Sequence, residues 1–484
     1  MAPAGLRPRN NLIAWLGYLL LAITVTLISQ EVIAFAGPIS LLYAIVFVII
    51  VITYSIVSLK APIIPFLVLV ASVGMLRYVW MLSAPILPDL FMDRISMVWL
   101  VIVFFGYSIY NRIPLRKPFT LDFLLLAHAI YIAARVLMTN PIHFHTWTQS
   151  VLTPYVVYFL AKNIVQTKRQ IRMVLIVLIT LSVYYTVTSI AEKFHIAELL
   201  FPRMMIEPHP EAAGRSSGPF RIPGTFGNTI GMLLPVFLYF ISQARLKISK
   251  ILFGFALLMG FVGLFFTYTR GSILGAAIGL GVVVFLNRKT YLPYVLPVLF
   301  LLPFVAINVI GVKEDEFLEE RIEATNPIES RIGSMVTGFR MWRDYPLFGC
   351  GPYQYRAFAE DYVAPIEVPI MGTVRFKHFR GAPAHDMYIG PMAEDGIIGM
   401  LLQYFIYFTI VRISLAKLSL RRQNDHFATY ILPLFFGIYT IYFFGGLITS
   451  FRHLSIMGSL FYMAAGITYG YTPEDAEENN SNNM

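Results

Sequence analysis

The sequence predicts a multi-pass membrane protein built of transmembrane α-helices, and three observations lead to that prediction. Of its 484 residues, 57% are apolar and only 13% are charged, and the mean hydropathy is +0.68, which is far above the range of soluble proteins. Apolar runs long enough to cross a bilayer as helices recur from one end of the chain to the other. Because lipid offers the backbone no hydrogen-bond partners, and because these runs are continuously apolar rather than alternating, they favour helices over a transmembrane barrel.

The apolar runs predict about fourteen spans, an all-α architecture. We place them at residues 12–29, 38–58, 62–81, 96–110, 120–138, 147–166, 171–190, 224–243, 250–268, 271–286, 291–311, 386–410, 427–448 and 453–471. The first run lacks a small-residue cleavage site, so we expect it to be a retained span. The single cysteine, Cys350, allows no internal disulfide.

Charge sets the expected orientation. With a cytoplasmic N-terminus, the inner loops carry 19 of the 37 Lys and Arg residues, whereas the short outer loops carry almost none. Both termini are then expected to be cytoplasmic, and the net charge of +10 reflects membrane topology rather than binding of nucleic acid. Two long outer segments, 191–223 and 312–385, are basic, and long loops are exempt from the charge rule.

These features divide the chain into five parts. We expect N-terminal transmembrane helices in residues 1–110, a transmembrane core in 111–311 with the outer loop 191–223, a large periplasmic loop in 312–385 between spans eleven and twelve, C-terminal helices in 386–471, and a disordered acidic tail in 472–484.

Three spans are expected to begin on the outer side with polar sequences: Arg221-Ile-Pro-Gly-Thr-Phe-Gly-Asn228, Thr267-Tyr-Thr-Arg270-Gly-Ser272 and His385-Asp386. Helix N-termini bind phosphate readily, and Arg221 and Arg270 add two guanidinium groups suited to a diphosphate. For Arg270 the alternative is an anchor that reaches the lipid headgroups, and Arg215 competes with Arg221 for the anion-binding role.

The periplasmic loop contains a predicted amphipathic helix, with Ile328, Ile332, Met335, Phe339 and Trp342 on one face. The helix is expected to lie on the membrane or to cap the bundle. Arg331 falls at the border of the apolar face, either reaching a covered pocket or acting as an ordinary interface residue. Arg77 and Arg135, near the outer ends of two spans, are explained by reaching the headgroups, and a supporting role at an anion site is the alternative.

The order of four sequences resembles that of the O-antigen ligase and O-antigen polymerase family: residues 221–228, residues 266–275, Arg331 through Pro346-Leu-Phe-Gly-Cys-Gly351, and His385-Asp386 followed by Glu394-Asp-Gly396. The resemblance covers roughly residues 90–470. His385, Asp386 and Gly396 match the spacing of the family's ligases. Asp386 stands where those ligases usually carry Asn, Ser or Gln, so a ligase, a polymerase and another polysaccharide transferase all stay open.

The resemblance implies a GT-C-like inverting glycosyltransferase that uses no metal and no cofactor. Its donor would be a glycan on undecaprenyl diphosphate, and its acceptor a glycan or lipid A-core. Carried over residue by residue, His385 is the general base and Arg221, Arg270 and Arg331 bind the diphosphate, with Arg215 and Asp386 as possible supporting residues. The main alternative from another class is a transporter or flippase for an anionic or lipid-linked substrate.

Overall fold

The structure is a computed structural model that describes residues 49, 53–76, 81–84, 87–112, 114–202, 205–206, 214–308, 326–368, 372–374, 384, 386–423, 425–447, 449–451 and 455–472. The chain forms two compact units, Met1–Ile113 and Pro114–Met484. The predicted span 12–29, most of the span 38–58, Arg77 and the C-terminal tail from residue 473 lie outside the described residues.

The described part of the first unit is a bent pair of helices followed by a hairpin and a long helix. Its elements are α3 (Ile63–Ala71), the π-helix η1 (Ser72–Leu76), the antiparallel strands β1 (Met81–Ala84) and β2 (Leu87–Phe91), and α4 (Met92–Tyr110). The helices Thr53–Lys60 and Ile63–Met75 meet at 118°. Pro62 lies at this bend, where proline disfavours a continuous helix.

The second unit is helical, with one short hairpin, in its described residues. Its elements are α5 (Thr120–Thr139), η2 (Pro141–His143), α6 (Phe144–Trp147), η3 (Thr148–Leu152), α7 (Thr153–Ile164), α8 (Lys168–Lys193), η4 (Ala197–Leu199), η6 (Gly218–Phe220), α9 (Pro223–Gln243), α10 (Lys247–Phe265), α11 (Arg270–Leu286), α12 (Arg288–Asn308), α14 (Asn326–Asp344), α15 (Tyr355–Tyr362), β3 (Ile366–Val368), β4 (Gly372–Val374), α16 (Ile389–Lys417), η8 (Leu418–Gln423), η9 (Phe427–Ile431), α17 (Leu432–Gly446) and α18 (Ser455–Gly470).

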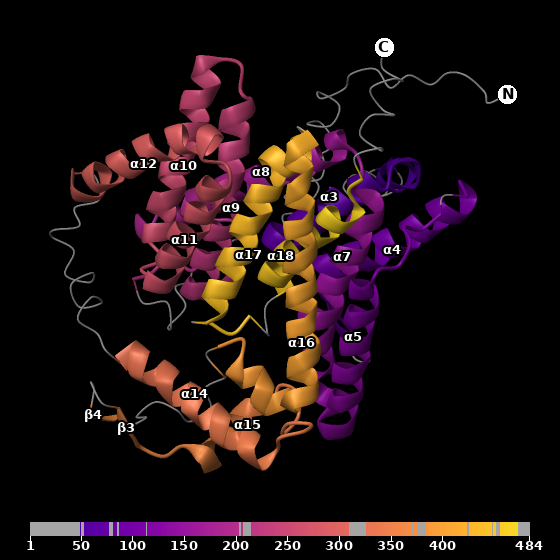
Figure 1. Cartoon of the computed structure of the whole chain (residues 1–484), viewed down its shortest axis with the longest axis vertical. Coiled ribbons are helices and arrows are strands. Elements are labelled where there is room, and N and C mark those ends of the chain that lie inside the picture. The colour runs from indigo at the N-terminus through magenta and orange to yellow at the C-terminus, as the bar shows by residue number, and fades with distance from the viewer. Residues whose placement is uncertain are drawn as a thin grey trace, which may run out of the picture. The chain divides into compact units, whose positions relative to one another are not determined.

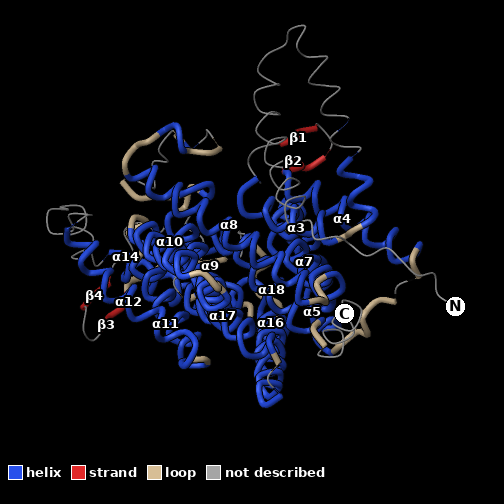
Figure 2. The backbone as a smooth tube through the Cα atoms, turned by 90° about the horizontal axis from the view of Figure 1, so that it is seen from above, coloured by secondary structure: helices blue, strands red, loops and turns tan. Residues whose placement is uncertain are grey.

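Helix α9 lies in the middle of this unit, among α8, α10, α11 and α17 (Figures 1 and 2). Of its most apolar stretch, 94% is buried, more than in any other candidate span of the described residues. Small residues permit the close packing: a Cβ added to Gly231 would lie 3.2 Å from the Ala276 Cβ of α11. The start of α9 is therefore enclosed by its neighbours.

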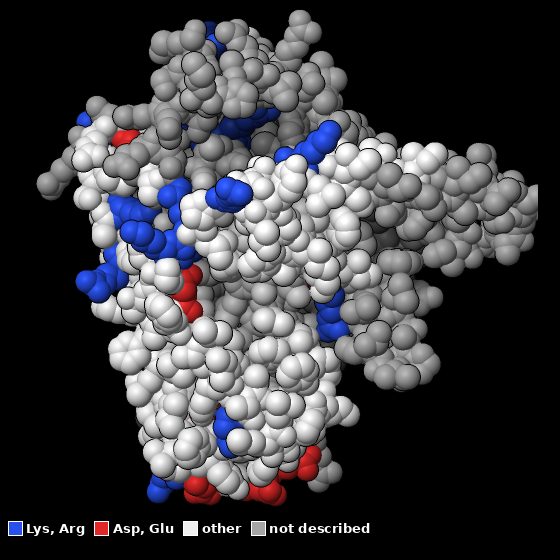
Figure 3. Space-filling model, turned by 90° about the vertical axis from the view of Figure 1, so that its right-hand side faces the viewer, with Lys and Arg blue, Asp and Glu red and all other residues white. Residues whose placement is uncertain are grey.

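The described helices confirm a polytopic membrane protein. Seven of them are long and apolar enough to cross a bilayer, or eight if the bent pair of the first unit forms one span. On the face drawn in Figure 3, uncharged side chains form a broad band, and charged side chains gather mainly above and below it. The count of fourteen spans and the cytoplasmic position of both termini stay predictions.

Helix α14 corresponds to the expected amphipathic helix, but it packs through a different face. Its closely packed side consists of small residues and Met341, and a Cβ added to Gly338 would lie 3.1 Å from Ile389 Cγ2 of α16. Phe339, on the predicted apolar face, is 49% exposed. Helix α14 therefore contacts α16 through its small residues, which allow a closer approach than aromatic ones, and the expectation that its apolar face lies on the membrane or caps the bundle stays a prediction.

Helix α16 corrects the prediction of one straight span over residues 386–410. Gly396 interrupts it with φ 67° and ψ −171°. Tyr407 Oη donates to Met387 Sδ over 3.6 Å, although a straight helix would separate residues twenty positions apart by about 30 Å. The chain therefore turns back at Gly396, and a first limb (389–395) lies beside a second limb (397–417). Both limbs are rich in apolar residues, so hydropathy does not reveal the turn.

The segment after α14 completes the hydrogen bonding that this turn interrupts. Three backbone bonds form what we call the backbone clamp: Ile397 N–H to Pro346 O (2.9 Å), Cys350 N–H to Ala393 O (3.0 Å) and Gly351 N–H to Glu394 O (2.9 Å). Arg135 of α5 donates a hydrogen bond from Nη2 to Gly349 O (3.1 Å), so it supports the clamp. The clamp fixes the C-terminal end of α14 against α16.

Candidate active site

The starts of α9 and α11 lie side by side. Ser272 Oγ donates to Gly224 O over 3.2 Å, and a Cβ on Gly227 would lie 2.8 Å from Thr267 Oγ1 and 2.9 Å from Ser272. Gly227 is therefore required for the close approach of these two helix starts. Arg221, two residues before α9, and Arg270, the first residue of α11, consequently belong to one corner of the unit, which we call the arginine corner.

The segment before Arg221 is held by the end of α8. The carboxylate of Glu192 accepts hydrogen bonds from the backbone N–H groups of Ser217 (2.7 Å) and Gly218 (3.0 Å). Arg221 itself adopts the left-handed conformation, with φ 57°, which is uncommon for residues other than glycine. Such a conformation persists only where the surrounding structure holds it, and it is found often at functional sites. Sequence reasoning missed Glu192, because nothing local to it predicts this long-range contact.

Arg215 contacts the turn that precedes α11. Its Nε donates to Thr267 O (3.0 Å) and its Nη2 donates to Thr269 Oγ1 (2.7 Å). Ser216 N–H adds a bond to Phe266 O of 2.9 Å. These bonds place Arg215 in the arginine corner, and they orient the turn that leads directly into Arg270.

Arg331 approaches the arginine corner from α14. Its pKa lies below the ordinary arginine value, first because the side chain is partly buried and second because of the positive charge of Arg270. Two guanidinium groups that repel each other in this way favour an anion between them. The charge of Arg270 thus acts on Arg331, and a shared anion site for Arg221, Arg270 and Arg331 stays a prediction.

The start of α16 is held by Asp386, whose side chain is 1% exposed. Its Oδ1 accepts backbone hydrogen bonds from Tyr388 (2.8 Å), Ile389 (2.5 Å) and Gly390 (3.2 Å), which caps the first limb. His385 lies outside the described residues, so its convergence with the arginines stays a prediction. Its two chain neighbours are described: Ala384 is buried in a cluster with Met341 of α14, and Asp386 forms the cap.

The segment 445–451 connects the start of α16 with the start of α9. Met387 N–H donates to Gly446 O over 2.7 Å. On the other side of the segment, a Cβ on Gly445 would lie 3.0 Å from Asn228 Oδ1, and a Cβ on Gly224 would lie 3.5 Å from Thr449 Oγ1. The cap at Asp386 and the arginine corner are thus linked through one short segment.

These features define a helical membrane protein with guanidinium groups gathered at two paired helix starts. The sequence profile of the O-antigen ligase family matches residues 254–404, which contain Arg270, Arg331, the backbone clamp and Asp386. The match covers about a third of the chain and supports its resemblance to the O-antigen ligase and polymerase family. Together with the apolar helices, the match supports a membrane protein with a role in O-antigen ligase- or polymerase-like polysaccharide biosynthesis. No curated protein matches the chain.

Proposed function

We propose that this protein transfers a glycan from undecaprenyl diphosphate to a hydroxyl group of an acceptor sugar, on the periplasmic face of the inner membrane and without a metal ion. Arg221, Arg270 and Arg331 bind the diphosphate, and His385 takes the proton of the attacking hydroxyl. The observation that supports the proposal is the arginine corner, where two helix starts and the partly buried guanidinium of Arg331 concentrate positive charge.

The reaction follows from these roles. The acceptor oxygen attacks the anomeric carbon of the donor and forms the new glycosidic bond, with inversion. The bond from that carbon to the diphosphate oxygen breaks, and the diphosphate leaves with the electron pair. Arginines that bind the diphosphate stabilise the charge that grows on it, and a histidine accepts a proton readily near neutral pH.

Incubation of the purified protein with an undecaprenyl diphosphate oligosaccharide tests the proposal. The products are analysed by size with and without a lipid A-core acceptor. Longer lipid-linked chains without the core acceptor indicate a polymerase, and glycan joined to the core indicates a ligase. If neither product forms with a donor that the protein binds, the proposed transfer is wrong.

Replacing Arg270 by alanine is expected to lower kcat/KM about 10- to 100-fold, because one cationic donor to the leaving diphosphate is lost. The matched control is Arg288→Ala, which removes an exposed arginine just beyond the opposite end of α11. Transfer rates of both variants at varied donor concentrations check the prediction. Equal losses in the two variants would contradict a specific role for Arg270.

Replacing Glu192 by alanine is expected to raise the donor KM about five- to tenfold, because the amides of Ser217 and Gly218 lose their shared carboxylate and the turn before Arg221 loosens. Glu192→Gln keeps one acceptor oxygen and is expected to recover most of the loss. An unchanged donor KM in Glu192→Ala would rule out this positioning role. A change in kcat without a change in the donor KM would also rule out the positioning role of Glu192.

One observation favours the alternative of a transporter or flippase. Interrupted helices at membrane depth are common in transporters, and α16 is interrupted at Gly396. The product analysis separates the two functions, since a transporter moves its substrate without joining it to an acceptor.

A further inference from the structure

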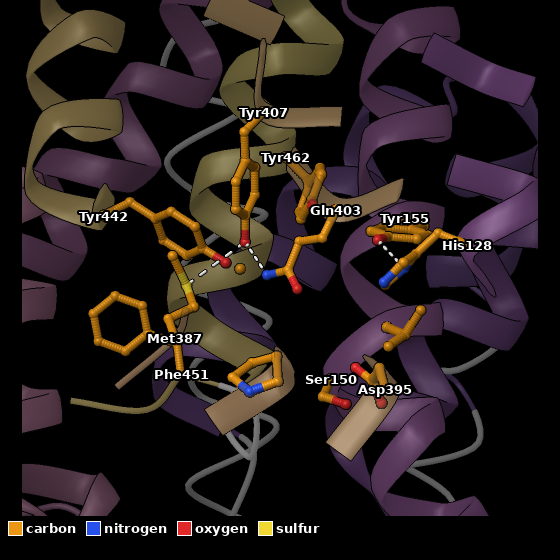
Figure 4. A pocket seen from close by; sticks show the side chains of 13 residues that line it. His128, Ser150, Tyr155, Met387, Asp395, Gln403, Tyr407, Tyr442, Phe451 and Tyr462 are labelled. Atoms are coloured by element: carbon orange, nitrogen blue, oxygen red, sulfur yellow. Dashed lines mark hydrogen bonds between the residues drawn. The ribbon is translucent and has the colours of Figure 1, made fainter. Parts of the chain in front are cut away.

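A second site lies on the other side of segment 445–451 from the arginine corner. It is a pocket between the two limbs of α16 and the helices α5, α7 and α18 (Figure 4). The pocket is partly open to solvent, and the centre of a water-sized sphere can occupy about 50 Å³ of it. Neither the mechanism above nor the family match gives it a role.

Aromatic rings and hydrogen-bonding groups line the pocket together. Tyr442 and Phe451 lie on one side, and Tyr155 lies on the other beside His128 (Figure 4). The polar groups are held in place by one another: Gln403 Nε2 donates to Tyr407 Oη (2.6 Å), and Tyr155 Oη and His128 Nδ1 are 2.7 Å apart. Ser150 and Asp395 add a hydroxyl and a carboxyl group at the lower edge of the view.

This lining selects a class of ligand. No lysine or arginine occurs among the described residues that line the pocket, and Asp395 disfavours an anion, so the diphosphate is a poor match. An apolar chain is also a poor match, because it would cover amide, imidazole and hydroxyl groups without hydrogen bonding to them. A neutral sugar ring suits both features, since its hydroxyls meet the polar groups and its apolar face packs against aromatic rings.

The position of the pocket gives this ligand a place in the reaction. Met387, which lines the pocket, follows the capping residue Asp386 directly in the chain, and Asp386 follows His385. Segment 445–451 contributes Phe451 to the pocket, while its Gly445 and Thr449 contact the start of α9. The pocket and the arginine corner thus flank the start of α16 from two sides.

We propose that this pocket binds the acceptor as a neutral, polyhydroxylated sugar ring, with donor diphosphate held in the arginine corner across segment 445–451. The inference rests on the proposed transfer and adds a separate site for its second substrate. Gln403 and Tyr442 contact the acceptor, which the pocket holds beside the start of α16.

Two pocket variants and one matched control test the assignment in full-length protein in lipid nanodiscs. Gln403→Ala and Tyr442→Phe each remove a polar group from the lining. Tyr439→Phe removes the hydroxyl of another buried tyrosine, about one turn away on α17, that does not line the pocket. The transfer rate is measured at varied acceptor concentration with saturating donor, and then at varied donor concentration with saturating acceptor. We expect the acceptor KM to rise about tenfold in Gln403→Ala and about threefold in Tyr442→Phe, with the donor KM and the Tyr439→Phe control unchanged.

Direct binding separates failure of this inference from failure of the proposed function. The probes are the oligosaccharide released from the donor lipid by mild acid and the lipid A-core saccharide, both without donor present. Binding of either probe that weakens in Gln403→Ala supports the pocket even if no product ever forms. Transfer with an unchanged acceptor KM in both pocket variants would overturn the pocket while leaving the function intact. A rise in the donor KM in place of the acceptor KM would also overturn the pocket assignment. Failure of the wild-type protein to bind either saccharide would overturn it as well.

Discussion

Gly396→Ala is expected to destabilise the protein by about 3 kcal/mol or more, and to abolish most transfer at temperatures where the variant stays folded. The backbone at Gly396, with φ 67° and ψ −171°, lies in a region that glycine alone occupies readily. An added Cβ would also lie 2.3 Å from Leu347 O and 2.4 Å from Leu347 C, which are backbone atoms of the clamp. Because these are backbone atoms and not the end of a flexible side chain, they cannot move aside locally. The segment that contains Leu347 must therefore separate from α16, which opens the clamp.

Opening the clamp also affects the arginine corner, because the clamp fixes the end of the helix that carries Arg331. Thermal unfolding in detergent and the transfer rate below the unfolding transition measure the two effects separately. Gly281→Ala is the matched control, since no atom lies within 4 Å of a Cβ added there and the residue is within helix α11. Wild-type stability in Gly396→Ala would mean that the chain does not turn back through this conformation.

Continuous apolar runs predicted the positions of most helices closely, because a span of lipid imposes one length and one secondary structure. The run 224–243 became α9 (Pro223–Gln243), and 120–138 became α5 (Thr120–Thr139). The turn at Gly396 was not predicted for the same reason. The apolar residues after it continue far enough to cross a bilayer, so the hydropathy of residues 386–410 predicts a single span. Only the pairing with Pro346–Gly351, some forty-five residues earlier in the chain, shows why a glycine is required there.

The candidate site was predictable where its chemistry is local. Arginines at helix starts with nearby glycines predicted an anion site, and in the structure the starts of α9 and α11 lie side by side, with Arg215 bonded to the turn before α11. The contacts that hold this corner were not predictable, because Glu192 and Ser217 lie far apart in sequence and neither belongs to a recognisable motif. The pocket was not predicted for a related reason, because its lining residues are far apart in sequence. They come from α5, η3, α7, both limbs of α16, α17, α18 and segment 445–451.

His385→Gln is expected to lower kcat about 10²- to 10⁴-fold while leaving donor binding within twofold of wild type, because general-base catalysis contributes an acceleration of about that size. The diphosphate would still be bound by the arginine corner, which lies at the starts of α9 and α11 and not at the start of α16. Glutamine retains hydrogen-bonding groups but takes up no proton near neutral pH, so the loss reports proton transfer rather than packing. Single-turnover transfer and equilibrium binding of the lipid-linked donor measure the two quantities independently.

The control for this variant is His195→Asn, at an exposed position after α8 where φ is 56° and asparagine is tolerated. It is expected to behave as wild type in both measurements. Loss of donor binding in His385→Gln would place the histidine in the diphosphate site instead of at the acceptor hydroxyl. Unchanged transfer in His385→Gln would mean that His385 is not the general base. The start of α16 would then contribute through the cap at Asp386, because Asp386 accepts the backbone hydrogen bonds of the first limb whatever residue precedes it.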